Sequence, residues 1–396
     1  MDRVGIYGAP QAQRPKVLVW DRPDESQMAL IFELADAWGW DLIGHEYLED
    51  GLPPDLTLSG ALITDLPDGA LAGELRKRGC PAVRFGRLPH PGDNTLPVVL
   101  QDQAAAGRLA AAHFVERRFK EVGIVSYHAS SPEMDNHTLW SAFCEHAQEL
   151  GVRCHSLDFH QKKDDELSAQ ERLPHRAKRL AAWVSDIPKP MGLFATSDEM
   201  ALTIWRMCER EGIRVPEEVA LLGGQNGRAC KLSTMRISSI DMGDSVRLKE
   251  AMRLLKRLMA GERAPTSPIL IPPQRLVERR STDVLAVSDP LAGRALTFIW
   301  ENIQTDPTVD EVANALEIPR RTLERRFRQA VGGGVKGEIM RRRLQVYCRL
   351  LRNSDEPIVD LAVKAGYQSQ EAMHRHFKKA MGTSPNAYRR AERGGG

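Results

Sequence analysis

Short apolar runs alternate with amphipathic stretches throughout the first 285 residues of this 396-residue chain. The runs have the length of strands, and the stretches between them have the apolar spacing of helices. This alternation predicts parallel sheets with helices on both faces. The expected strands form two series, at residues 16–20, 60–64 and 81–85, and at residues 121–126, 192–195 and 219–223. Two series predict two lobes with a ligand cleft at the carboxyl ends of the strands.

The pattern after residue 285 has helical spacing. A short helix with an apolar face that includes Ile358 leads to Gly366, and a second helix starts at a serine cap, Ser369. Glycine can adopt the positive φ that a turn between two such helices requires. Met373 and Phe377, four residues apart, give the second helix an inward face. Two helices joined in this way form a helix-turn-helix, which predicts DNA binding.

Charge is unevenly distributed between the two parts of the chain. Residues 291–396 contain 19 Lys and Arg against 12 Asp and Glu, a net charge of +7, so the preceding residues carry −5 of the total of +2. A basic surface alone is as consistent with a solvated face as with a nucleic-acid site. Coupled to a helix-turn-helix, it indicates a domain that neutralises DNA phosphates.

Residues 358–389 resemble the signature of AraC/XylS-type transcription regulators. The matching positions are Gly366-Tyr367, Phe377-Lys378, Gly382, Pro385 and Tyr388-Arg389. Such domains carry two helix-turn-helix units, which implies a second unit upstream. Residues 309–318 and 319–328 have the pattern for it, and Thr308 with Glu311 forms a capping box that marks its first helix independently of the resemblance.

The resemblance also implies how the two units are joined. A helix over residues 336–352 is expected to connect them, so that they enter successive major-groove segments on one DNA face. Two features depart from the family pattern. Three glycines at 332–334 replace a single one, and Tyr347 stands where alanine is common, so its ring must find space against a neighbouring helix.

DNA contacts are expected from the outward faces of the two recognition helices. Arginine bonds guanine, glutamine bonds adenine, and glutamate accepts from cytosine. The family's base-contacting positions correspond here to Arg321, Glu324, Arg325, Gln370, Glu371, His374 and Arg375. Candidate phosphate contacts, which position a protein without reading sequence, are Arg320, Arg326, Arg328, Lys378 and Lys379. For any one base candidate, a phosphate or solvent role is nearly as consistent with the sequence.

A second resemblance is carried by residues 96–102, Gly107, 110–113, 194–201 and 212–223, and by the tail from 238–239 to 272–273 and 280–283. These segments are similar to LacI/GalR-type effector domains, which have the periplasmic-binding-protein fold. A LacI-like sensor ahead of an AraC-type reader is the arrangement of XylR-type, xylose-responsive activators. The implied fold is a two-lobed α/β periplasmic-binding-protein-like sensor domain, followed by an all-α domain with two helix-turn-helix units. The expected boundaries are a tail at 1–15, the sensor at 16–285 and the DNA-binding domain at 286–396.

Effector contacts are expected from polar side chains that follow strands and from aromatic rings that stack on a sugar. The candidates are Trp20, Asp21, Asp65, Asp102, Trp140, Ser197, Asp198, Gln225 and Asn226. Each aspartate is equally consistent with a turn or capping role, and a tryptophan is more often a core residue than a stacking ring. Two departures affect the sugar's identity. Residues 223–226 replace the usual Gly-x-Asp, and Leu139 stands where arginine is frequent.

The resemblance implies promoter DNA, a sugar effector (D-xylose), a second copy of the chain in a homodimer and RNA polymerase as partners, without a cofactor, a metal or a membrane. The expected function is D-xylose-responsive activation of pentose-utilisation genes. One alternative is the same architecture with another sugar or polyol. An enzyme such as an AraC-domain DNA-repair methyl acceptor is disfavoured, because the sequence contains no Pro-Cys-His-Arg tetrad. A plain sugar-transport protein is disfavoured by the basic C-terminal part.

The six cysteines show no Cys-x-x-Cys pair, so they are expected to be scattered, reduced thiols of a cytoplasmic protein. Residues 1–15 lack the apolar stretch of a signal peptide. No run approaches the roughly 18 apolar residues of a membrane helix.

Overall fold

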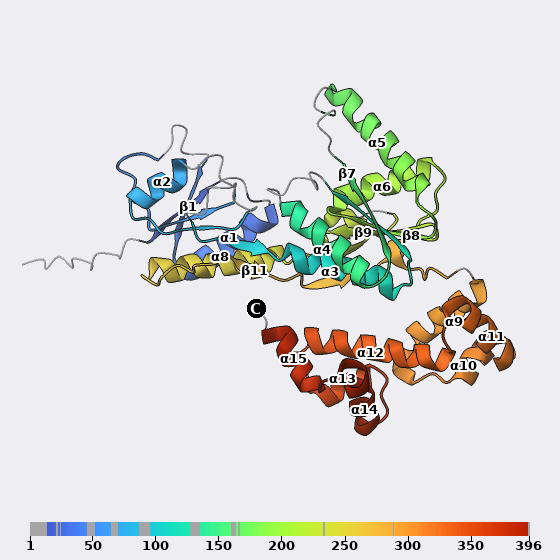
Figure 1. Cartoon of the computed structure of the whole chain (residues 1–396). Helices are drawn as coiled ribbons and strands as arrows, with labels where there is room; N and C mark the ends of the chain where they lie inside the picture. The colour runs from blue at the N-terminus through green and yellow to red at the C-terminus, as the bar shows by residue number, and fades with distance from the viewer. Residues whose placement is uncertain are drawn as a thin grey trace, which may run out of the picture. The chain divides into compact units, whose positions relative to one another are not determined.

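The computed structural model describes residues 14–20, 23, 25–45, 52–64, 70–86, 96–126, 135–159, 164, 167–232, 234–287 and 289–394. The chain forms two compact units, with the boundary between Asp283 and Val284, and the short segment Arg117–Phe119 groups with the second unit. The first unit is α/β and the second is all-α, so the expected fold class is confirmed (Figure 1).

The first sheet of the first unit has four parallel strands in the order β2-β1-β3-β4. They are β1 (Lys16–Trp20), β2 (Asp41–Gly44), β3 (Gly60–Ile63) and β4 (Ala82–Arg84). Side chains of β1 alternate between two cores: Val17 and Val19 pack with α1 (Glu25–Trp38) and α8 (Asp244–Met259), whereas Leu18 packs on the side of α2 (Ala70–Lys77). Helices therefore cover both faces, as a run of buried strand residues predicts.

The second sheet has six strands in the order β12-β10-β9-β8-β6-β7, and β12 alone is antiparallel to its neighbour. The strands are β6 (Glu121–Ser126), β7 (Arg153–Asp158), β8 (Met191–Ala195), β9 (Val219–Gly224), β10 (Ser238–Asp241) and β12 (Arg275–Val277). Its helices are α3 (Gln103–Glu116), α4 (Asp135–Glu149), α5 (Ala169–Asp186), α6 (Asp198–Arg210) and α7 (Arg228–Leu232). A third, two-stranded parallel sheet pairs β5 (Val99–Gln101) with β11 (Ile269–Ile271).

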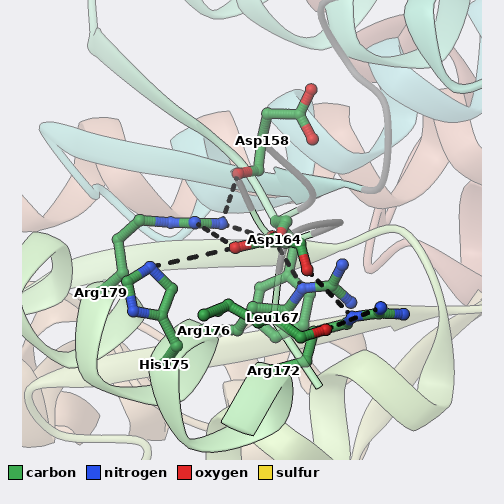
Figure 2. A network of polar contacts seen from close by, with 8 residues as sticks. Asp158, Asp164, Leu167, Arg172, His175, Arg176 and Arg179 are labelled. Atoms are coloured by element: carbon green, nitrogen blue, oxygen red, sulfur yellow. Dashed lines mark hydrogen bonds and ion pairs between the residues drawn. The ribbon is translucent and has the colours of Figure 1, made fainter. Parts of the chain in front are cut away.

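A network of polar contacts surrounds one buried carboxylate, that of Asp164, which lies between β7 and α5 in the sequence (Figure 2). Arg176 donates from Nε to Oδ2 over 2.8 Å, and Arg179 donates from Nη1 to Oδ1 over 3.2 Å. Arg172 and Arg179 also donate to main-chain carbonyls, those of Asp164 at 3.1 Å and Asp158 at 3.2 Å respectively. A carboxylate that is fully buried is strongly destabilising without cationic partners, and Arg176 and Arg179 of α5 supply these partners to Asp164.

The second unit is built from seven α-helices and one short 3-10 helix (Ile303–Thr305) within the described residues. The α-helices are α9 (Pro290–Glu301), α10 (Val309–Ala315), α11 (Arg320–Val331), α12 (Val335–Asn353), α13 (Ile358–Lys364), α14 (Gln370–Met381) and α15 (Pro385–Gly394). A single apolar core runs from Ala292 in α9 to Phe377 in α14 and includes residues of both helix-turn-helix units. The expected connecting helix over residues 336–352 is confirmed as α12.

Candidate DNA-reading surface and effector site

The first helix-turn-helix consists of α10 and α11. Its predicted capping box is present: Glu311 N donates to Thr308 Oγ1 over 3.2 Å, and Thr308 N donates to Glu311 Oε2 over 2.7 Å. The bond from the Thr308 main chain holds the pKa of Glu311 below its usual range. Leu323 and Phe327 are fully buried, so α11 has an inward face. Its outward face exposes Arg321, Arg325 and Arg328.

Several charged residues of α11 already have partners inside the protein. Arg320 pairs with Asp310 at 3.0 Å and with Glu324 at 3.2 Å. Arg326 makes a bidentate pair with Asp289, at 2.6 and 2.8 Å, and Asp289 also caps α9 through Leu291 N. This pairing gives Arg326 a structural role, in addition to the phosphate contact expected from the sequence.

The second helix-turn-helix consists of α13 and α14, and its turn requires a glycine. Gly366 has φ +86°, and a Cβ at this position would lie 2.0 Å from the carbonyl oxygen of Ile303. Ser369 caps α14 by accepting a hydrogen bond from Ala372 N over 3.1 Å. Met373 and Phe377 are fully buried. The predicted turn, cap and inward face are therefore all confirmed.

The outward face of α14 carries the second set of predicted base contacts. Gln370, Glu371, His374 and Arg375 are exposed. Across the described part of the chain, none of these four side chains has an ion pair or hydrogen bond. Lys378 and Lys379, the predicted phosphate contacts, are exposed in the last turn of the same helix. Polar side chains that are free of internal partners can meet base edges without first breaking a contact.

Aromatic packing fixes α12 against the second helix-turn-helix. Tyr347 is fully buried, and its ring lies 5.6 Å from that of Phe377 and 5.8 Å from that of Tyr367, both in edge-to-face geometry. Its hydroxyl donates to Ile358 O over 3.1 Å, and burial raises the pKa of Tyr347 to about 12. This residue, which departs from the family pattern, therefore occupies the core between α12, α13 and α14.

In the first unit, four predicted effector residues lie on two adjacent turns, those after β8 and β9. Asp198 is 1% exposed, and its carboxylate accepts from Ser239 Oγ and from Gly227 N, each over 2.6 Å. Burial raises the pKa of Asp198. A Cβ on Gly223 would lie 2.6 Å from this carboxylate. Because both oxygens are occupied, Asp198 joins the two turns rather than presenting its carboxylate at the surface.

Gln225 and Asn226 follow β9 in left-handed backbone conformations, with φ of +95° and +55°. Asn226 N donates to Ser239 Oγ over 2.9 Å, and its Oδ1 accepts from Arg279 over 2.5 Å. The side chain of Gln225 is exposed. Ser197 caps α6 by accepting from Met200 N over 3.2 Å. These residues therefore form one polar end of the second sheet.

The other predicted effector residues lie elsewhere in the first unit. The ring of Trp20 lies 5.6 Å from that of His45, and Asp102 caps α3 by accepting from Ala105 N over 2.8 Å. Trp140 is on α4, and its Nε1 is buried without a hydrogen-bond partner among the described residues. Within the described residues, no hydrogen bond or ion pair joins these three side chains to the polar end of the second sheet. Asp21 and Asp65 lie outside the described residues.

Leu139, one of the two departures from the sensor pattern, is a core residue. It is 3% exposed on α4, and its carbonyl oxygen would lie 2.5 Å from a Cβ on Gly107 of α3. The helices therefore pack with their backbones in close approach. Leu139 therefore takes part in the α3–α4 contact through its main chain.

No described helix is long and apolar enough to cross a membrane.

Comparisons with known proteins place the same two modules in the same order. Residues 111–282 match the family model of a periplasmic binding protein-like domain, and residues 312–391 match that of a helix-turn-helix domain. The chain is 29% identical over 338 residues to the xylose operon regulatory protein of Escherichia coli K12, with 84% of each chain covered. It is 26% identical over 337 residues to that of Haemophilus influenzae, covering 84% of this chain and 85% of the relative.

A solved structure has the same arrangement over nearly the whole length. The structure of the xylose-binding transcription activator XylR aligns with 96% of this chain and 98% of that chain, at a TM-score of 0.55 and 26% identity. The likeness therefore extends across both units rather than to one module alone.

Proposed function

We propose that D-xylose is the effector that controls the binding of this chain to promoter DNA, because the chain belongs to the XylR-type transcription regulators of the AraC family. The chain is a sugar-responsive, sequence-specific DNA-binding regulator and not an enzyme. The observation that supports D-xylose as the effector is the similarity to the xylose operon regulatory proteins of two bacteria, which extends over 84% of this chain.

DNA is read, in this proposal, by α11 and α14. Both helices bury one face in a common core and leave the opposite face exposed, which is the requirement for a helix that enters the major groove. We assign base contacts to Arg321, Glu324, Arg325, Gln370, Glu371, His374 and Arg375. We assign phosphate contacts to Arg320, Arg326, Arg328, Lys378 and Lys379. The net charge of +7 over residues 291–396 supports this electrostatic footprint.

We assign the effector site to the predicted residues of the first unit. Gln225, Asn226 and Ser197 supply polar groups at the end of the second sheet, and Asp198 shapes that end through the Ser239 and Gly227 bonds. The indole N–H of Trp140, which has no hydrogen-bond partner among the described residues, is a donor that a sugar hydroxyl can satisfy. Trp20, Asp21, Asp65 and Asp102 complete the proposed set.

Regulation follows from differential affinity. A sugar that binds one arrangement of the sensor more tightly than another shifts the population towards it. By linkage, a shift that changes DNA affinity must also change sugar affinity when DNA is bound. We propose that the active form is a homodimer in the cytoplasm that activates transcription by RNA polymerase.

The decisive experiment is a thermal-shift titration of the full-length protein against pentoses, hexoses and polyols. A ligand at 100-fold its dissociation constant stabilises the native state by about 2.7 kcal/mol, so D-xylose should raise the melting temperature visibly. Asp102→Ala should abolish this rise, whereas the exposed Asp55→Ala is a matched control that should retain it. A response that survives in Asp102→Ala would contradict the assignment of Asp102.

A second candidate effector, another sugar or a polyol, has one observation in its favour. The charged side chains that are usual in the family's sugar site are absent. Residues 223–226 replace Gly-x-Asp, and a buried leucine, Leu139, stands where arginine is frequent. A melting-temperature rise with another panel member, and none with D-xylose, would select this alternative. Silence across the whole panel would contradict both.

A further inference from the structure

Two cysteines that are ten residues apart in sequence meet in the first unit. Cys144 is in the last half of α4, and Cys154 is the second residue of β7. Cys154 Sγ donates to Cys144 Sγ over 2.8 Å. The tight turn between the two elements brings them together, with Gly151 at φ +76° and a main-chain bond from Val152 N to Ala147 O of 3.1 Å. Both cysteines are partly exposed.

The other four cysteines have a different environment. Cys80, Cys208, Cys230 and Cys348 are all buried. Burial raises the pKa of Cys80 to about 11 and that of Cys208 to about 12. Because the thiolate is the reactive form and access is needed for reaction, these four are inert. The pair at 144 and 154 is distinguished by both proximity and access.

We propose that Cys144 and Cys154 form a redox-sensitive thiol pair that closes to an intramolecular disulfide on exposure to a low-molecular-weight disulfide. A disulfide bond is about 2.05 Å long, so the two sulfurs need to approach by less than about 1 Å. No other pair of described cysteines has its sulfurs in contact. The inference does not depend on the identity of the effector.

The local chemistry indicates which sulfur reacts first. The hydrogen bond from Cys154 lowers the pKa of Cys144, and the same bond raises the pKa of Cys154. The Cys144 thiolate attacks one sulfur of the small disulfide, whose S–S bond breaks and releases one thiolate. Cys154 then loses its proton to solvent, and its sulfur attacks Cys144 to displace the second thiolate. Two protein thiols are oxidised, and one small disulfide is reduced to two thiols.

The crosslink would hold α4 to the edge strand β7. Trp140 lies one turn before Cys144 on α4, and this helix packs closely on α3 at Gly107. A covalent link at this point therefore restricts the helix that carries a proposed effector contact. This last consequence rests on the proposed function, whereas the formation of the disulfide does not.

The test uses the full-length protein, treated with oxidised glutathione, alkylated under denaturing conditions and measured by intact mass and peptide mapping. We expect the number of alkylated cysteines to fall from six to four, with peptides containing Cys144 and Cys154 linked. Closing this short loop should raise the melting temperature by on the order of 5 °C. Six alkylated cysteines, or a link through any other cysteine or between two chains, would overturn the proposal.

Single substitutions separate the pair from general oxidation. Cys144→Ser and Cys154→Ser should each prevent the intramolecular link and remove the oxidant-dependent rise in melting temperature. Cys80→Ala should leave both unchanged, because Cys80 is buried elsewhere in the unit. A Cys144→Ser or Cys154→Ser protein that still shows an oxidant-dependent rise would also overturn the proposal. None of these measurements requires sugar, so their outcome is independent of the xylose assignment.

Discussion

The two helix-turn-helix units share one core, yet different interactions hold their recognition helices. Ion pairs anchor α11: Arg320 binds Asp310 and Glu324, and Arg326 binds Asp289. By contrast, α14 is positioned by a serine cap at Ser369 and by aromatic packing, and its exposed polar side chains have no internal partners among the described residues.

This difference predicts which side chains of each helix contact DNA. Charged groups that are already paired inside the protein must give up a contact to bind a phosphate, which reduces their net contribution. We therefore expect α11 to read DNA mainly through Arg321 and Arg325, which lie outside these pairs. We expect α14 to use its whole outward face.

The largest effect should come from Gly366→Ala. The new Cβ would lie 2.0 Å from the Ile303 carbonyl oxygen, and the residue would have to keep a φ of +86°. Left-handed strain together with overpacking should lower the free energy of unfolding of the second unit by about 3 kcal/mol or more. Chemical denaturation of the full chain measures this.

Gly382→Ala provides the matched control, because Gly382 has a φ of +70° and no atom within 4 Å of its Cβ position. Here the left-handed conformation alone should destabilise by about 1 kcal/mol. Equal effects at the two positions would show that the contact with Ile303 is unimportant.

Removal of side chains proposed to contact bases should have the next largest effect. Arg321→Ala on α11 and Gln370→Ala on α14 should each weaken binding by about 1–3 kcal/mol, with relaxed preference at one or two base positions. Binding to a library of operator variants measures both quantities. A loss that is uniform over all sequences would assign the residue to phosphate instead.

Anchoring of the first helix-turn-helix can be tested through Asp289. Asp289→Ala removes the cap of α9 and the partner of Arg326 together, so it should destabilise by roughly 1–2 kcal/mol. Ser369→Ala removes only the cap of α14 and should destabilise by about 1 kcal/mol. If Ser369→Ala were the more damaging change, the contrast between the two helix-turn-helix units would be wrong.

The Asp289 pair should also produce a pH dependence. Hydrogen bonds from Arg326 hold the pKa of the Asp289 carboxyl below its usual range. The pair therefore stabilises the native state above the unfolded pKa of about 3.9, and this stability is lost as the pH falls through the lower folded value. Unfolding of wild type and Asp289→Ala should converge below that range.

The smallest effect concerns phosphate contacts. Lys378→Ala should reduce the slope of log affinity against log salt by about 1. Arg320→Ala should reduce it by less, because Arg320 is already paired with Asp310 and Glu324. Equal slopes for the two variants would show that the internal pairs open without penalty on DNA.

Much of the fold could be predicted because it depends on neighbours in the chain. The strands at residues 16–20 and 121–126 match β1 and β6, and the capping box at Thr308 marks α10 as expected. Strand β2 (Asp41–Gly44) was not predicted, and it has no buried residue. A strand at the sheet edge need not have the continuous apolar run that identifies a central strand.

The roles of the proposed effector residues were harder to predict than the outward faces of α11 and α14. An outward helical face follows from spacing alone, so Gln370 and Arg321 could be placed on it before the structure was known. The burial of Asp198 depends on Ser239 and Gly227, which belong to other segments of the chain. The sequence around Asp198 does not distinguish a ligand contact from a buried carboxylate that joins two turns by hydrogen bonds.

The two modules, their order, and the caps and turns of the helices follow from local sequence, because spacing, caps and glycine conformations act over a few residues. Which groups meet across longer separations is set by the packing of whole elements. Arg326 lies 37 residues from Asp289, and Cys154 lies 10 from Cys144. Such pairings depend on how completed elements pack, and no local pattern encodes that packing.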